Sequence, residues 1–292
     1  MASGKDTGAL KTAVVTGATD GLGRATALML AANGYRVFGG GRNAGRLASL
    51  QGEASQRKLA LTALEMDVTS DDSVSRAIQT IQNAAGTIDI LVNNAGIGFV
   101  VPMEEISLAD LRRQYETNVF GVVRVTQHVL PGMRAQGRGR IVNMSSIAGK
   151  VSTPLFGAYS SSKFALESIS DAWRLELGQF GIQVILIEPG IIPSGMEGAV
   201  RELSGAYTDL QAGPYAAIKA SFESMWAAES AKATTTPDDC ARVILNALRA
   251  ARPKARYPVT STATAMTYLR RILSDRTLDR MILRRYKLRK PS

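Results

Sequence analysis

A tyrosine and a lysine separated by three residues can form a proton-transfer pair, and this spacing occurs at Tyr159–Lys163, Tyr215–Lys219 and Tyr286–Lys290. In a helix, side chains at i and i+4 lie on one face, so the ammonium can approach the phenol. A phenol normally has a pKa of about 10, and a nearby positive charge stabilises the phenolate and lowers that pKa. Such a tyrosine can protonate a carbonyl oxygen or remove the proton of an alcohol.

Only the first of these pairs has the surroundings that this chemistry needs. Ser146 lies 13 residues before Tyr159, at the expected end of a strand, whereas glutamate and leucine occupy the corresponding positions of the other two pairs. We therefore expect Tyr159 to act as general acid and base, Lys163 to lower its pKa, and Ser146 to orient the substrate oxygen. Ser145, at a spacing of 14, is the weaker alternative for this last role.

A glycine-rich turn near the N-terminus indicates a site for a phosphate-containing cofactor. The motif TGATDGLG at residues 16–23 follows the first expected strand and opens the first expected helix. Glycines allow a diphosphate to approach the backbone, where helix N-terminal amides favour an anion. An ordinary strand–helix turn is the alternative, but the position in the first βα connection favours the cofactor site. The residues expected to contact the cofactor here are Gly17, Thr19, Asp20, Gly21, Leu22 and Gly23.

The ends of the next three strands extend this site. Arg42 follows the second strand, 19 positions after Gly23, where a carboxylate would bind the ribose of NAD and an arginine accommodates the 2′-phosphate of NADP. We therefore predict NADP(H), with a solvated surface arginine as the alternative. The third strand end offers a carboxylate to the adenine amino group, and the fourth offers a second turn of small residues. The residues expected to contact the cofactor there are Asp67, Val68, Asn94, Ala95 and Gly96.

Alternating hydrophobic patterns predict the elements that position these residues. Runs typical of buried parallel strands occur at 13–15, 36–38, 61–66, 88–92, 140–143, 183–187 and 256–259. Amphipathic segments typical of helices lie at 23–32, 70–84, 107–135 and 158–180. This alternation predicts a single Rossmann-type, doubly wound α/β domain over residues 1–260, with a seven-stranded parallel sheet and helices on both faces. Residues 196–235 have a weaker pattern and are expected to form a mobile substrate flap.

Composition excludes several classes of protein. The chain of 292 residues is 45% hydrophobic and 21% charged, which is ordinary for a globular domain and unlike a disordered or collagen-like chain. With Cys240 as the only cysteine and His128 as the only histidine, neither a disulfide framework nor a multi-histidine metal site is expected. No apolar run is long enough for a membrane span, and the N-terminus lacks the apolar core of a secretory signal. A cytoplasmic location is therefore expected.

The C-terminal end is strongly basic. Residues 252–292 contain twelve basic and two acidic residues, which accounts for the whole net charge of +10. We expect residues 261–292 to form a basic extension of two short amphipathic helices. Their apolar faces are Leu269, Ile272 and Leu273 in the first, and Leu278, Met281, Ile282 and Tyr286 in the second. These faces are expected to pack on the core, with weak docking on an anionic membrane as the alternative. No nucleic-acid partner is expected, because the segment has no recognised binding motif.

The ordered set of motifs resembles the short-chain dehydrogenase/reductase superfamily. TGATDGLG, NNAG at 93–96, a serine at a strand end, YSSSK at 159–163 and PG at 189–190 occur in this order, and they cover about residues 10–260. The resemblance is to compact members of roughly 250 residues, in particular those like hydroxysteroid and retinol dehydrogenases. It implies an oxidoreductase that transfers a hydride between NADP(H) and a carbonyl/alcohol pair. It also implies a homodimer or homotetramer.

The same resemblance assigns roles that spacing alone does not. It implies that Asn118 anchors a water in a proton relay to Lys163. It also implies that the loop after the sixth strand offers the amide of Ile192 and the hydroxyl of Ser194 to the nicotinamide carboxamide. Threonine is usual where Ser194 stands, and Pro193 beside it is less usual. The residues assigned to the cofactor in this part of the site are Tyr159, Lys163, Pro189, Gly190, Ile192 and Ser194.

The positions expected near the substrate are apolar. They are Phe99, Val100, Val101, Ile147, Val151, Leu155, Phe156, Ile191 and Met196. The absence of charge among them argues against sugars and carboxylates and favours a steroid, retinoid, fatty or aromatic ketone or aldehyde. A catalytically idle dinucleotide sensor that acts through a protein partner is the alternative function. It predicts a damaged catalytic set, whereas Asn118, Ser146, Tyr159 and Lys163 are all present.

Overall fold

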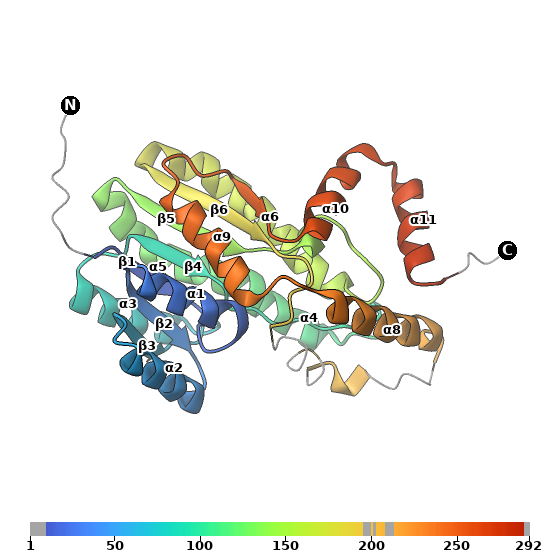
Figure 1. Cartoon of the computed structure of the whole chain (residues 1–292), viewed down its shortest axis with the longest axis horizontal. Helices are drawn as coiled ribbons and strands as arrows, with labels where there is room; N and C mark the ends of the chain where they lie inside the picture. The colour runs from blue at the N-terminus through green and yellow to red at the C-terminus, as the bar shows by residue number, and fades with distance from the viewer. Residues whose placement is uncertain (1–9, 195–199, 201–202, 208–212, 289–292) are drawn as a thin grey trace.

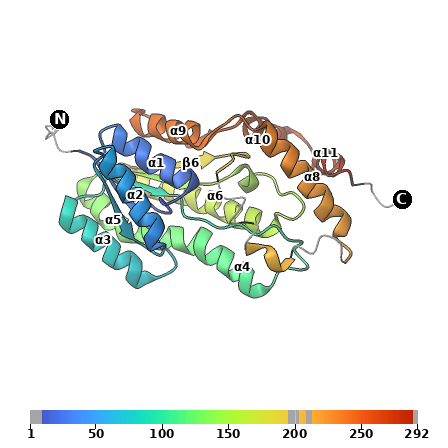
Figure 2. The ribbon, with the colours of Figure 1, turned by 60° about the horizontal axis from the view of Figure 1, so that its bottom comes forward.

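A seven-stranded parallel sheet forms the centre of the protein (Figures 1 and 2). This computed structural model describes residues 10–194, 200, 203–207 and 213–288. In spatial order the strands are β3 (Leu61–Glu65), β2 (Arg36–Gly41), β1 (Thr12–Val15), β4 (Ile90–Asn93), β5 (Gly139–Met144), β6 (Ile182–Glu188) and β7 (Arg256–Pro258). The strand order reverses between β1 and β4, which is where this fold places ligands. The predicted seven-stranded, doubly wound fold is confirmed.

Helices cover both faces of the sheet. One face carries α1 (Gly21–Ala32), α2 (Ala44–Gln56) and α9 (Pro237–Arg249), and the other carries α3 (Asp71–Ala85), α5 (Gly121–Gln136) and α6 (Gly157–Leu177). Each layer buries its own apolar cluster against the strands. Leu30 and Ile244 belong to the first cluster, and Ile78 and Val129 belong to the second. The strands are consequently apolar on both sides, as their composition predicts.

Three helical segments differ from the sequence prediction. The segment expected at 107–135 consists of α4 (Leu108–Tyr115), a π-helical turn (Glu116–Phe120) and α5. The segment expected at 158–180 ends as α6 at Leu177 and continues as a 3₁₀ turn, Gly178–Phe180. Helix α2 was not predicted, because only Leu50 and Ala54 of its residues are buried and the apolar periodicity is correspondingly weak.

The C-terminal part adds three helices at one end of the molecule. These are α8 (Ala216–Lys232), within the expected flap, and α10 (Ser261–Ile272) and α11 (Asp275–Arg285), within the expected basic extension (Figure 1). The predicted apolar faces are only partly correct. Leu278 and Tyr286 are buried, but Ile272 is 76% exposed and Met281 is 40% exposed. Ile272 differs because α10 is buried near its first turn, at Ala263, and its last residue lies beyond that contact.

Candidate active site

The glycine-rich turn is packed so tightly that side chains cannot replace its glycines. Gly17 and Gly21 have positive φ angles of 63° and 51°, a conformation that glycine adopts at low cost. A Cβ on Gly23 would lie 2.1 Å from the Gly17 carbonyl oxygen, and one on Gly21 would lie 2.6 Å from the Ser194 carbonyl oxygen. Asp20 caps α1 by accepting a 2.8 Å hydrogen bond from the Gly21 amide. The turn therefore presents backbone and a helix N-terminus to the crevice, which suits a diphosphate.

Asn94 and Thr16 hold this turn against the end of β4. The Asn94 side-chain amide donates to the carbonyl oxygens of Thr16 and Gly17, at 3.0 Å each. The Thr16 hydroxyl oxygen accepts from the amides of Asn94 and Ala95, also at 3.0 Å each. Asn94 was predicted to contact the cofactor, and its side chain is engaged in shaping the turn. Thr16 was not singled out from the sequence, because its partners lie 78 and 79 residues away.

Two arginines lie near the expected adenosine end of the site. The Arg42 guanidinium is 57% exposed and lies 3.9 Å from a carboxylate oxygen of Asp67. Arg46, in the first turn of α2, forms a 3.0 Å ion pair with Asp20. Asp67 also accepts hydrogen bonds from the amide and hydroxyl of Thr69, at 2.9 and 2.8 Å. Arg46 was missed by sequence reasoning because only folding brings α2 back to the glycine-rich turn.

Other residues predicted to contact the cofactor are packed closely against neighbouring residues around this crevice. Val68 packs against Gly121, where an added Cβ would lie 2.9 Å from a Val68 methyl group. Thr19 packs against Gly41, and Gly17 leaves no room for a Cβ beside Ala95. The crevice therefore requires small residues on both sides. Leu22, Asn94 and Gly96 line the same cavity as Ser146, Tyr159 and Lys163.

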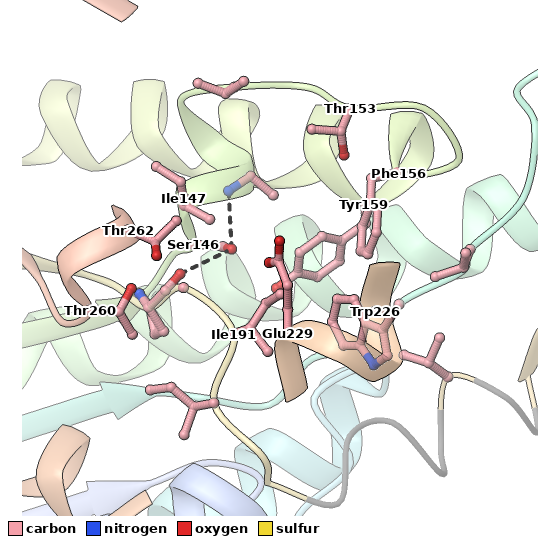
Figure 3. A pocket seen from close by; sticks show the side chains of 18 of the residues that line it. Ser146, Ile147, Thr153, Phe156, Tyr159, Ile191, Trp226, Glu229, Thr260 and Thr262 are labelled. Carbon is pink, nitrogen blue, oxygen red and sulfur yellow. Dashed lines mark hydrogen bonds between the residues drawn. The ribbon is translucent and has the colours of Figure 1, made fainter. Parts of the chain in front are cut away.

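Ser146, Tyr159 and Lys163 line one cavity near the carboxyl end of β5, and Figure 3 shows Ser146 and Tyr159. Tyr159 and Lys163 lie one helical turn apart in α6, and Lys163 Nζ lies 5.5 Å from the centre of the Tyr159 ring. Burial raises the pKa of Tyr159 to about 12, while a hydrogen bond with Ser146 lowers it. The expected lowering of this pKa below that of an ordinary phenol is therefore not found in this structure, because burial dominates. Burial lowers the pKa of Lys163 to about 8, while the charge of Glu167 raises it. Lys163 Nζ donates a 2.8 Å hydrogen bond to the Met144 carbonyl oxygen.

Asn118 occupies the π-helical turn and faces the loop after β4. Its side-chain oxygen accepts from the Ile97 amide at 2.9 Å, and its amide donates to the Ile97 carbonyl oxygen at 2.9 Å and to Ser162 Oγ at 3.1 Å. Gln114, one turn earlier, donates to the same carbonyl at 2.5 Å. The two amides therefore hold residue 97 next to α6, and Gln114 was not predicted. The water relay expected at Asn118 stays a prediction.

The loop after β6 lies beside the catalytic serine. Ser146 Oγ donates to the Pro189 carbonyl oxygen at 3.4 Å and accepts from the Ala148 amide at 3.1 Å (Figure 3). Gly190 packs against Thr260, and an added Cβ would lie 2.2 Å from the threonine hydroxyl. The loop thus passes between Ser146 and the start of α10. Pro189, Gly190, Ile192 and Ser194 all line the cavity.

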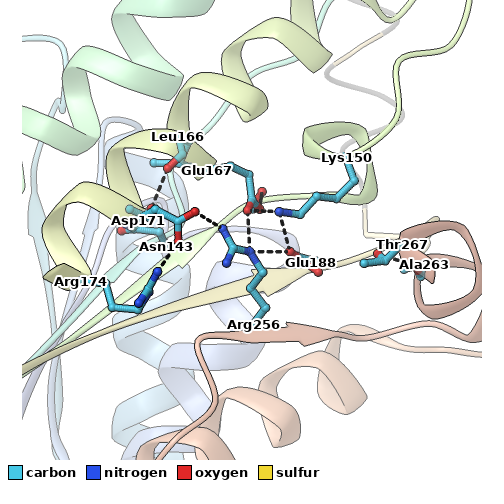
Figure 4. Close-up of polar contacts among 12 residues, drawn as sticks. Asn143, Lys150, Leu166, Glu167, Asp171, Arg174, Glu188, Arg256, Ala263 and Thr267 are labelled. Carbon is cyan, nitrogen blue, oxygen red and sulfur yellow. Dashed lines mark hydrogen bonds and ion pairs between the residues drawn. The ribbon is translucent and has the colours of Figure 1, made fainter. Parts of the chain in front are cut away.

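A largely buried cluster of charges surrounds Glu167, four residues after Lys163 in α6 (Figure 4). Glu167 accepts a 2.5 Å hydrogen bond from Ser145 Oγ and is paired with Lys150 and Arg256. Glu188 is also close to both cations, at 3.4 Å each, and burial followed by the charge of Glu167 raises its pKa. Sequence reasoning missed this cluster. Its only signal was the position of Glu167 four residues after Lys163, on the same helical face.

A cavity of about 650 Å³ opens beside Tyr159 and the glycine-rich turn, and most of its walls are apolar. Charged side chains also line it, namely Lys219, Glu223, Glu229, Lys232 and Arg285. Seven of the positions expected near the substrate line it, namely Phe99, Val100, Ile147, Val151, Leu155, Phe156 and Ile191. Val101 is instead fully buried in a neighbouring cluster with Ile106 and Ala158. Met196 lies outside the residues that the structure describes.

The far wall of the cavity comes from the C-terminal helices. Phe222 and Trp226 of α8 pack around Phe156, with ring centres 5.4 and 5.9 Å from it. Tyr286 is 2% exposed, donates to the Pro154 carbonyl oxygen at 3.3 Å, and accepts from Ser221 through its own carbonyl. An ion pair between Arg285 and Glu229 also joins α11 to α8. The basic extension therefore packs on the molecule and helps to enclose the cavity.

No group of histidine, cysteine or acidic residues in the described ranges could hold a metal ion. Cys240 is buried, which raises the pKa of its thiol to about 12. His128 lies in α5, where its Nδ1 is 3.0 Å from the carbonyl oxygen of Arg124. None of the helices in the described parts of the chain combines the length and hydrophobicity needed to cross a bilayer.

The fold and this site define a dinucleotide-binding α/β oxidoreductase with a tyrosine–lysine pair beside its cofactor crevice. The family model "short chain dehydrogenase" matches residues 11–204. The chain therefore belongs to the short-chain dehydrogenase family, whose members are oxidoreductases that use nicotinamide dinucleotides. The sequence resembles compact members of roughly 250 residues. The similarity extends further than that, because individual relatives match more than nine-tenths of this chain of 292 residues.

Two relatives and one solved structure illustrate the similarity. Human retinol dehydrogenase 8 is 32% identical, with 94% of this chain and 91% of the relative covered. The NADPH-dependent 3-dehydrocapnine reductase of Ornithobacterium rhinotracheale is also 32% identical, with 93% and 96% covered. A short-chain dehydrogenase/reductase from Burkholderia phymatum, solved in complex with NAD, has a TM-score of 0.79 at 25% identity, with 97% and 98% covered. Both forms of the cofactor thus occur among similar proteins.

Proposed function

We propose that this protein transfers a hydride between NADP(H) and an apolar carbonyl/alcohol pair, with Tyr159 as general acid and base. The observation that carries the proposal is the meeting of Ser146, Tyr159 and Lys163 at the floor of an apolar cavity beside the glycine-rich turn. The bound nicotinamide would supply or accept the hydride. The turn fits such a group because it exposes backbone amides at the N-terminus of α1 with no side chain in between.

The roles of the side chains follow from their positions. In carbonyl reduction, Tyr159 donates its phenolic proton to the substrate oxygen, and Ser146 holds that oxygen by a hydrogen bond. The resulting phenolate is stabilised by the Lys163 ammonium, whose charge Glu167 favours. In alcohol oxidation the same tyrosine removes the hydroxyl proton. Asn118 holds the loop over Lys163, and we propose that it also positions the water that returns the proton from solvent.

The preference for NADP(H) is supported by the arginines at the second strand end. A guanidinium can bind a phosphate in a charge-assisted, bidentate manner, and Arg42 is exposed at the position where the 2′-phosphate is expected. Changing Arg42 to Asp is expected to weaken NADPH relative to NADH by roughly 10- to 100-fold, since it removes this pair and adds a repulsive charge. Titration of cofactor fluorescence measures both dissociation constants. Equal affinity of the unaltered protein for the two cofactors contradicts the assignment.

The apolar part of the cavity walls supports this substrate class. Phe99, Leu155, Phe156, Phe222 and Trp226 surround the space in front of Tyr159, which suits a steroid, retinoid, fatty or aromatic ketone or aldehyde. The relatives agree with this class, since one is named for retinol and another for 3-dehydrocapnine. A cytoplasmic location is part of the same proposal.

A homodimer or homotetramer is proposed from the outer faces of α4–α6. Large apolar side chains are exposed there, and they are Leu108, Phe120, Phe164 and Leu175, with Phe180 just after α6. Exposed apolar patches of this kind typically mark subunit interfaces. Light scattering at micromolar concentration should give at least twice the mass of one chain, and a monomer would contradict the proposal.

The reaction is tested by NADPH oxidation with a panel of apolar ketones and aldehydes. Turnover is expected with at least one steroid, retinoid, fatty or aromatic member and not with sugars or keto acids. Tyr159→Phe should retain NADPH binding and lose this turnover. If the unaltered protein binds NADPH but turns over no member in either direction, the dinucleotide-sensor alternative is favoured.

A further inference from the structure

A row of three arginines runs along α11 on the side away from the cavity. Arg276, Arg280 and Arg284 are exposed and recur at i, i+4 and i+8, which places them on one helical face. Ile282 and Tyr286 of the same helix line the cavity and lie on the opposite face. Helix α11 therefore separates the cavity from a charged outer surface.

The charge of this row is not neutralised within the described residues. Arg270 and Arg285 are paired with Asp275 and Glu229, but no described carboxylate lies within 4 Å of the guanidinium groups of the row. Asp279 lies between Arg276 and Arg280 in the sequence, and it forms no ion pair with any described residue. Like charges at i, i+4 spacing repel one another. Such a row is consequently complementary to an anionic partner.

The preceding helix, α10, also exposes large apolar side chains. Tyr268 is 62% exposed and Ile272 is 76% exposed, and they lie four residues apart near the end of α10. Arg271 between them is exposed as well. A phosphate backbone would use the charges alone, whereas a bilayer uses both the charges and the apolar side chains.

We propose that Tyr268, Ile272, Arg276, Arg280 and Arg284 form a C-terminal basic surface that docks on bilayers containing anionic lipids. The position of α11 is held by packing, because Leu278 and Tyr286 on its other side are buried. Docking places the wall of the cavity at the surface of the bilayer, where apolar ketones and alcohols accumulate. This last consequence rests on the proposed function, but the docking itself does not.

Vesicle co-sedimentation of the full chain tests the proposal. Vesicles of phosphatidylcholine alone are compared with vesicles containing phosphatidylglycerol, at low and at physiological salt. Binding is expected only to the anionic vesicles and should weaken as salt rises. Arg276→Gln/Arg280→Gln/Arg284→Gln should weaken it about fivefold per arginine, on the order of 100-fold in total. Tyr268→Ser/Ile272→Ser should weaken binding at both salt concentrations.

A matched variant removes three charges elsewhere. Lys58→Gln/Arg76→Gln/Arg252→Gln alters exposed cations outside this surface and should bind vesicles like the unaltered protein. Equal loss in both triple variants, no binding to anionic vesicles at low salt, or tighter binding to mixed-sequence DNA than to vesicles overturns the proposal. NADPH oxidation with a short water-soluble ketone is measured in parallel. Because sedimentation needs no turnover, failure of docking and failure of the proposed reaction are separate results.

Discussion

Two tyrosine–lysine pairs with the same spacing lie in the described part of this protein, and their immediate surroundings differ. Tyr159 hydrogen-bonds Ser146, and Lys163 donates to a backbone carbonyl rather than to a carboxylate. Tyr215 instead donates to Glu104, and Lys219 forms a 2.7 Å ion pair with Glu105. The third pair ends at Lys290, outside the described residues.

The comparison shows that neighbouring groups, rather than spacing, decide the chemistry. The hydrogen bond to the Glu104 carboxylate engages the Tyr215 hydroxyl and raises the pKa of that tyrosine. Burial raises the pKa of Tyr159, and the hydrogen bond with Ser146 opposes this rise. Lys219 is neutralised by a partner and cannot stabilise a phenolate elsewhere. Lys163 forms no ion pair with a described carboxylate, and its Nζ lies 5.5 Å from the centre of the Tyr159 ring. Substitutions at matched positions of the two pairs test this difference.

The largest expected effect comes from the two tyrosines. Tyr159→Phe removes the transferable proton and keeps the ring, so turnover should fall by a factor on the order of 100 to 10,000. Tyr215→Phe removes only an exposed hydrogen bond, and turnover should stay within about threefold. Steady-state NADPH oxidation measures both, and cofactor titration confirms that each variant still binds NADPH. Similar losses in the two variants would mean that the wrong pair has been assigned.

The two lysines should separate activity from stability. Lys219→Met leaves Glu105 without its cation, and the free energy of unfolding should fall by about 1–2 kcal/mol, since the pair is only partly buried. Lys163→Met removes a buried ammonium that has no carboxylate in contact, so stability should be retained while turnover falls by at least tenfold. Urea unfolding followed by fluorescence gives the first quantity. Loss of stability in Lys163→Met with retained turnover would reverse the assignment.

The sequence alone predicts the part of this site that is local along the chain. Strand ends, the glycine-rich turn and the spacing of Ser146, Tyr159 and Lys163 depend on short-range patterns, so all seven strands and the proximity of these three residues could be anticipated. The remainder depends on distant contacts. Arg256 reaches Glu167 across 89 residues, and Tyr286 reaches Pro154 across 132 residues. No periodicity in α8 or α11 indicates which cavity these helices enclose.

The smallest expected effect is a shift in pH dependence, and it concerns the carboxylate nearest to the catalytic pair. Burial lowers the pKa of Lys163 to about 8, and Glu167 opposes this by favouring the ammonium. Glu167→Gln removes that charge, so the pKa of Lys163 should fall further and the ammonium should be lost at lower pH. Because the ammonium stabilises the Tyr159 phenolate, the basic limb of the pH profile of kcat should move to lower pH by about one unit.

Asp171→Asn is the matched control for this measurement. Asp171 pairs with the same Arg256 at 2.7 Å but lies two helical turns from Lys163 and makes no contact with Ser145. A general loosening of the charge cluster would lower kcat in both variants without moving the basic limb. A basic limb that stays in place in Glu167→Gln, or moves equally in Asp171→Asn, would show that the charge of Glu167 does not act on the pair. A shift confined to Glu167→Gln would show that the position of the carboxylate distinguishes the two pairs. In Tyr159–Lys163 the carboxylate of Glu167 lies one helical turn after the lysine, whereas in Tyr215–Lys219 the carboxylate of Glu105 is in contact with the lysine.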